Sequence, residues 1–159
     1  MITQPTMING LLLASPQKRL MAFIIDFALI YLVLFAFINL NEGFRTLIAQ
    51  HHRNMDDVGL LKQIMAINDN IKFTTFIVWV LLGAIMDSSK IQGTPGKLIV
   101  QIKVVGTNRD KISLQKAIER NISKIISSIL FLGFIFIAFN KNYQGFHDKI
   151  AKTFVINRV

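Results

Sequence analysis

Three apolar runs, separated by polar and charged segments, dominate the hydropathy pattern of this chain. The first covers residues 20–40 and is apolar apart from Asp26 and one asparagine. At about 1.5 Å per residue this run measures roughly 30 Å, the thickness of the hydrocarbon core of a bilayer. A second run covers residues 70–86 if Lys72 snorkels to the interface, and a third covers residues 122–139. The pattern predicts an α-helical integral membrane protein with about three helical spans.

Shorter elements are predicted between the first two runs. Residues 41–72 have the pattern of two short amphipathic helices, the second capped by Asp56 or Asp57. The apolar residues that this second helix would bury are Leu61, Ile64 and Met65.

The segment after the second run predicts a strand followed by an amphipathic helix. Leu98–Val105 alternates with a period of two and ends in a turn. Ser113 then caps a helix that buries an apolar face and directs a charged face outward. The apolar face consists of Leu114, Ala117, Ile118 and Ile122, and the outward face of Lys116, Glu119, Arg120 and Ser123. Thr153–Val159 is a second β-rich run, and we expect the two strands to pair on the cytoplasmic side.

Charge and composition favour the membrane interpretation. The chain is 52% hydrophobic and carries a net charge of +9, with most basic residues placed between the apolar runs. The distribution predicts a cytoplasmic N-terminus, an outer segment 41–72 and a cytoplasmic segment 87–124. Three full crossings would place the C-terminus outside, whereas its basic residues and the strand pair favour the cytoplasm. The partner is therefore expected to be the lipid bilayer and not nucleic acid.

No sequence motif for catalysis, metal binding or a cofactor is present. The chain has no cysteine, which excludes disulfides and thiolate metal sites. The segment Gly93–Lys97 lacks the spacing of a phosphate-binding loop and predicts a tight turn. The adjacent His147 and Asp148 favour a helix start or turn capped by Asp148 over a catalytic or metal-binding pair. We therefore expect a protein that is not an enzyme and that needs neither a metal nor a cofactor.

Asp26 is the strongest candidate for function because charged groups at that depth are costly and must face protein or water. Arg19 lies seven residues earlier, on the same helix face and about 10 Å away along the axis. One interpretation is a proton or cation site at Asp26, where Arg19 sets its charge or orients another acid. The other is a buried polar anchor that joins this helix to its neighbours. The spacing alone leaves both open.

Four sequence blocks together resemble the RDD family of small bacterial membrane proteins. They are RLMAFIID at 19–26, GTPGKLIVQIKVV at 93–105, SLQKAIERN at 113–121 and QGFHDKIAKTFV at 144–155. The family is named for one arginine and two aspartates. Arg19 and Asp26 match the first two, and Asp148, or as a second choice Asp87, matches the third. The resemblance implies one multi-pass domain over 1–159 in the bacterial cytoplasmic membrane.

Two functions of different classes follow from these features. The family resemblance favours a transport component that moves a small cation or proton, for which cation/proton exchange has been proposed in some members. Asp26 would then be the intramembrane site, with Arg19, Arg120 and Asp148 as a charged lining. The alternative is a non-catalytic assembly factor or accessory subunit that binds another membrane protein. Either protein could form a homo-oligomer, and three runs in one chain make an oligomer the expected form of a transporter.

Overall fold

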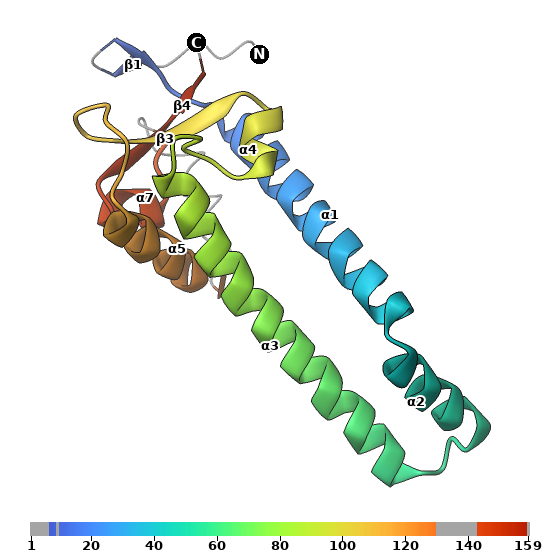
Figure 1. The fold of residues 1–159 in the computed structure, drawn as a ribbon. Coiled ribbons are helices and arrows are strands. Elements are labelled where there is room, and N and C mark those ends of the chain that lie inside the picture. Colours follow the sequence, from blue (N-terminus) through green and yellow to red (C-terminus); the bar gives the residue numbers. More distant parts are fainter. Residues whose placement is uncertain (1–6, 9, 130–142, 159) are drawn as a thin grey trace. The chain divides into compact units, whose positions relative to one another are not determined.

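A computed structural model describes residues 7–8, 10–129 and 143–158 of the chain, and these residues are mostly helical (Figure 1). The elements in chain order are β1 (Met7–Ile8), β2 (Leu11–Leu12), α1 (Pro16–Leu40), α2 (Glu42–Arg53), α3 (Val58–Ser88), α4 (Pro95–Ile99), β3 (Ile102–Gly106), α5 (Leu114–Ile129), α7 (Phe146–Ile150) and β4 (Thr153–Asn157). They form two compact units, one made of Met1–Asp26 with Val80–Val159 and the other of Phe27–Trp79.

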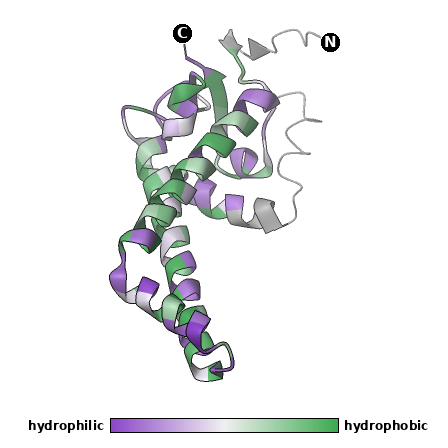
Figure 2. Cartoon of the chain, turned by 90° about the vertical axis from the view of Figure 1, so that its right-hand side faces the viewer, coloured by the Kyte–Doolittle hydropathy of each residue, from purple (hydrophilic) through white to green (hydrophobic). Residues whose placement is uncertain are grey.

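Two of the described helices, α1 with 25 residues and α3 with 31 residues, are long and apolar enough to cross a membrane. Few of their side chains are buried, and hydrophobic residues recur along both helices (Figure 2). Large apolar side chains such as Leu32 and Val33 remain about two-thirds exposed, at 64% and 65%. An apolar surface of this extent is typical of lipid contact. The predicted first and second spans are thus both helical.

Helix α3 is one continuous helix, whereas the hydropathy pattern predicted a short amphipathic helix followed by a separate apolar span. The prediction of a short helix that buries Leu61 and Met65 was wrong, because both side chains are exposed on α3. Asp57 does cap the helix, since its Oδ1 accepts a hydrogen bond from the backbone N–H of Leu60 at 2.9 Å. No glycine or proline lies between residues 60 and 82, so nothing in the sequence ends the helix there.

The described residues hold two candidate spans, and the prediction of about three is not confirmed. The predicted span 122–139 begins within α5, but residues 130–142 lie outside the described part of the chain.

Strands β3 and β4 form an antiparallel pair in which Val104 lies opposite Val155. This confirms the predicted strand pair and most of the strand expected at Thr153–Val159. The strand predicted at Leu98–Val105 was half wrong, because Leu98 and Ile99 belong to α4, residues 100–101 form a turn, and β3 begins at Ile102. Pro95 explains the difference: its fixed φ suits the first turn of a helix, and α4 begins at this residue.

Helix α5 begins as predicted, with the backbone N–H of Lys116 donating to the Ser113 hydroxyl at 3.3 Å. Its faces are only partly those predicted: Ala117 is buried and Lys116 and Glu119 are exposed, as expected. Arg120 and Ser123 are buried, at 2% and 6% exposure, whereas Leu114 and Ile122 are each 49% exposed. Amphipathic patterning assigns charges to solvent, and it fails here because acidic partners from other elements surround Arg120.

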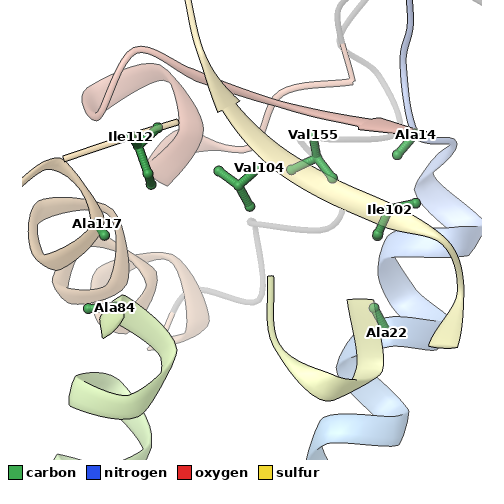
Figure 3. Packing of buried hydrophobic residues seen from close by; sticks show 8 residues of the cluster. All are labelled: Ala14, Ala22, Ala84, Ile102, Val104, Ile112, Ala117 and Val155. Carbon is green, nitrogen blue, oxygen red and sulfur yellow. The ribbon is translucent and has the colours of Figure 1, made fainter. Parts of the chain in front are cut away.

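The core of the first unit is small and lies between the strand pair and the helix ends. Its buried residues are Ala14, Ala22, Ala84, Ile102, Val104, Ile112, Ala117 and Val155 (Figure 3). Figure 3 shows Ala84 of α3 beside Ala117 of α5. A Cβ placed on Gly83 would lie 3.2 Å from the Asn121 side chain. The small residues Gly83 and Ala84 therefore let α5 approach α3 closely.

Candidate functional site

A network of buried charged side chains lies beside this core, with the guanidinium of Arg120 at its centre. Nη1 of Arg120 donates to Oδ2 of Asp87 at 2.6 Å. Its Nε and Nη2 both donate to Oδ1 of Asp148, at 2.9 and 2.7 Å. Both acids are fully buried. A planar guanidinium with several fixed donors is suited to bridging two carboxylates in this way.

Each of the two acids has further cationic partners. Asp148 accepts a hydrogen bond from Nη1 of Arg19 at 2.5 Å. Asp87 is paired with the buried ammonium of Lys97 and lies 4.0 Å from Nζ of Lys124. Isolated buried charges are prohibitively costly, so stable burial requires such pairing. The network links the ends of α1 and α3 to α4, α5 and α7.

The ionisation of the network follows from burial and from these partners. Burial alone would raise the pKa of Asp148, but the positive charges of Arg120 and Arg19 hold this pKa well below its usual range. Burial would lower the pKa of Arg120, and the two acids raise it instead. Asp148 is therefore ionised and Arg120 protonated at neutral pH.

His147 does not act as a charged member of the network near neutral pH. Its Nε2 lies 3.4 Å from Oδ1 of Asp148. Burial, only partly opposed by Asp148, lowers the pKa of His147 to about 3. Its ring is therefore neutral over the physiological range. Among the described residues, Nδ1 of His147 and both Nε and Nη2 of Arg19 have no hydrogen-bond partner.

Asp148 also fixes the start of α7. The backbone N–H of Gly145, which precedes the helix, donates to Oδ2 of Asp148 at 3.1 Å. This is the helix-start role predicted for Asp148, and the same carboxylate holds the two arginines. Within the described part of the chain, no group of three or more acidic, histidine or cysteine side chains is placed to hold a metal ion.

Asp26 lies outside the ion-paired cluster and contacts residues 94–97, the loop that leads into the first turn of α4. Its Oδ2 accepts a hydrogen bond from the Thr94 hydroxyl at 2.5 Å, and its Oδ1 accepts one from the backbone N–H of Gly96 at 2.7 Å. The residue is half-buried. The carboxylate therefore faces protein, as expected for an acid within an apolar helix.

Gly96 is the point of closest approach between this loop and α1. A Cβ at this position would overlap the backbone oxygen of Ala22 and lie 2.9 Å from Cγ of Asp26. Any residue larger than glycine would therefore push the loop away from α1. Lys97 follows directly, so the contact with α1 also positions the ammonium that pairs with Asp87.

The structure brings together three of the four residues that the sequence indicated. Arg19, Arg120 and Asp148 meet in the network, and Asp26 joins it indirectly through the loop of Gly96 and Lys97. Arg19 pairs with Asp148 and therefore orients another acid, which was one of the two roles considered for it.

The sequence did not predict that Lys97 and Asp87 belong to the buried network. Lys97 was assigned to a turn, and Asp87 was only the second choice for the third acid. Their signals in the sequence are an acid directly after an apolar run and a lysine directly after Gly96. Neither signal reveals the pairing by itself.

Two long apolar helices joined to a buried charge network define a small helical protein with the features of an integral membrane protein. The chain belongs to the RDD family, whose model matches residues 13–152. It is 41% identical over 81 residues to the uncharacterized protein YxaI of Bacillus subtilis (strain 168). That match covers 50% of this chain and 53% of YxaI, so the chain spans about half the length of that relative. No solved structure matches the chain.

The first prediction concerns the bridging arginine. Arg120→Ala leaves Asp87 and Asp148 buried with fewer cations, and loss of one partner of a buried pair costs about 3–5 kcal/mol. We expect a large fall in the thermal unfolding temperature of the detergent-purified protein. Lys116→Ala, on the exposed side of the same helix, is the matched control and should have little effect. Equal unfolding temperatures for the two variants would contradict a stabilising network.

The second prediction concerns the contact between the loop and α1. Gly96→Ala should destabilise the protein by about 3 kcal/mol, the upper end of the usual cost of overpacking. Gly106→Ala is the control, because a Cβ there would meet no atom closer than 3.6 Å. Thermal unfolding of both variants in the same detergent measures the difference. A Gly96→Ala protein as stable as the wild type would show that the loop does not contact α1 as described.

Proposed function

We propose that this protein is a non-enzymatic transport component that moves a small cation or a proton, with Asp26 as the exchanging group. The observation that supports this function is the position of the Asp26 carboxylate. It lies within the first apolar helix and contacts the loop that carries a member of the buried network. Ionisable groups within membrane helices are expensive and usually serve function. Family membership supports a membrane location but does not specify a substrate.

The contacts of Asp26 suggest how occupancy of this site would affect the rest of the protein. A proton or cation on the carboxylate competes with the N–H of Gly96 and the hydroxyl of Thr94, both of which now donate to it. Loss of these hydrogen bonds frees the loop that positions Lys97 against Asp87. Binding would therefore favour an arrangement in which the loop has moved away from Asp26. The size of this shift depends on how much more tightly the ion binds that arrangement.

The second candidate function is a non-catalytic accessory subunit that binds another membrane protein. A specific observation favours it: both oxygens of Asp26 already accept hydrogen bonds from this chain. A carboxylate satisfied in this way serves equally well as a structural anchor. Under this alternative, the exposed apolar helices would contact the partner, and Asp26 would only hold the loop in place.

The third prediction separates the two functions. Asn at position 26 can accept from the Gly96 N–H and donate to the Thr94 hydroxyl oxygen, so Asp26→Asn removes the charge and preserves the hydrogen-bonding geometry. We expect it to abolish cation-driven proton movement in proteoliposomes while leaving the unfolding temperature nearly unchanged. Internal pH is followed with a trapped dye after sodium or potassium is added outside.

Thr94→Val provides the matched control for this flux experiment. It removes one hydrogen bond to Asp26 and keeps the carboxylate, so flux should be reduced at most several-fold and not abolished. Wild-type flux in Asp26→Asn would exclude Asp26 as the exchanging group. No flux from correctly inserted wild-type protein would favour the accessory subunit.

We further propose that α1 and α3 cross the bacterial cytoplasmic membrane, with Asp26 inside it and the strand pair of the first unit on the cytoplasmic side. Lys18 and Arg19 lie at the start of α1 and further basic residues accumulate in the segment after α3, as the positive-inside rule requires. Strands β3 and β4 are hydrogen-bonded neighbours. The chain therefore leaves β3 and returns to β4 on the same side of a membrane. This arrangement supports the cytoplasmic C-terminus that the strand pair favoured.

The fourth prediction tests this topology. The chain has no native cysteine, so single cysteines report their own location. We expect Thr107→Cys and Lys152→Cys to react with an impermeant maleimide only after the cells are opened. Met55→Cys, in the link between α2 and α3, should react in intact cells. Labelling of residues 107 and 152 from opposite sides would contradict the topology.

A further inference from the structure

Helix α5 has an apolar edge that the core and the charge network leave partly exposed. Leu114 and Ile122 are each 49% exposed, and Ile118 between them packs against the core and is partly buried. These residues are four apart, so they form one stripe along the helix. The neighbouring face holds the buried Arg120 and Asn121. The apolar edge therefore lies between this buried face and an exposed polar face that holds Lys116 and Glu119.

The depth of α5 relative to the long helix α3 is set by its contacts. Asn121 approaches Gly83, and Ala117 lies in the same cluster as Ala84 (Figure 3). These α3 residues lie four to five positions before Ser88, where α3 ends, which is roughly 6–8 Å along the helix axis. If α3 crosses the membrane, α5 lies at the boundary between headgroups and acyl chains. Interfacial amphipathic helices are buried to the same depth.

The surface charge of the first unit indicates the kind of lipid that this edge fits. In the described part of the first unit, the exposed basic side chains outnumber the exposed acidic ones. They are Lys90, Arg109, Lys111, Lys116, Lys149 and Lys152, against Asp110 and Glu119. Basic residues near a membrane surface attract anionic headgroups. Two other surroundings fit the edge less well. Water would leave its apolar side chains exposed, and contact with a soluble protein would not explain why the edge lies beside the end of α3.

We propose that α5 is an interfacial helix that inserts Leu114, Ile118 and Ile122 into the cytoplasmic leaflet of a bilayer containing anionic lipid. This inference rests on the proposed crossing of the membrane by α3 and adds a second mode of lipid contact. The charge network then has a further role, because Arg120 anchors the polar side of the same helix. Lipid on one side and the buried acids on the other fix the rotation of α5.

A spin-label experiment tests the proposal in the reconstituted full-length protein. Single cysteines are introduced as Ile122→Cys and Glu119→Cys, a matched pair on the exposed surface of α5, and as Phe35→Cys on α1. Each is labelled with a nitroxide in vesicles of phosphatidylglycerol and phosphatidylcholine. Collision rates with oxygen, which partitions into lipid, and with a water-soluble nickel complex are then compared. The ratio reports whether each label lies in lipid or in water.

We expect the label at residue 122 to collide more with oxygen than with nickel, and the label at residue 119 to show the opposite preference. The label at residue 35 is the reference for insertion. Lipid exposure at residue 35 together with water exposure at residue 122 would overturn the inference while leaving the membrane topology intact. Low access to both reagents at residue 122, with dipolar broadening, would identify a second copy of the chain as the occupant and would also overturn it.

Discussion

The arrangement of the first unit depends on a single guanidinium shared between two buried carboxylates. Arg120 uses three of its nitrogens to hold Asp87 and Asp148, which come from α3 and α7. A buried carboxylate without a cation would become protonated or would open the structure. Because one residue bridges both acids, the end of α3, the helix α5 and the start of α7 stabilise one another. The apolar core beside them is made largely of alanine and β-branched residues and has few large side chains to hold these elements by itself.

The four sequence blocks that resemble the RDD family are the same segments that meet around this network. The first supplies Arg19 and Asp26, and the second supplies Thr94, Gly96 and Lys97. The third supplies Arg120 and the fourth Asp148. The blocks are far apart in the chain, with up to 129 positions between bonded partners. Their common feature is therefore a tertiary one: each places a polar group where the helix ends and the strand pair converge.

The spacing of apolar residues predicted the elements whose structure depends on local sequence. It missed the features that depend on contacts with residues far away in the chain. The long apolar runs gave α1 and the second half of α3, and the cap at Ser113 gave the start of α5. The same pattern placed Arg120 in solvent, because nothing local indicates that acids 28 and 33 positions away will surround it. The alternating residues after Gly96 suggested a strand, whereas Pro95 and the contact with α1 favour a short helix. Local rules thus identified Asp26 and Arg19 as unusual but could not determine which groups they bind.

Lys97 is the residue through which Asp26 and the network are energetically coupled. Burial lowers the pKa of Lys97, and Asp87 opposes this most strongly, with a smaller contribution from Asp26. Neutralising Asp26 therefore removes a small part of the electrostatic support for a buried ammonium, whereas displacing its two hydrogen bonds would release the loop. In the exchange site proposed above, linkage would make the effect reciprocal: an arrangement that moves Lys97 away from Asp87 would also change how tightly an ion binds beside Asp26. Asp26 as a structural anchor and Asp26 as an exchange site share the same hydrogen bonds. The two functions differ in whether the protein also populates an arrangement in which the loop has moved away from Asp26.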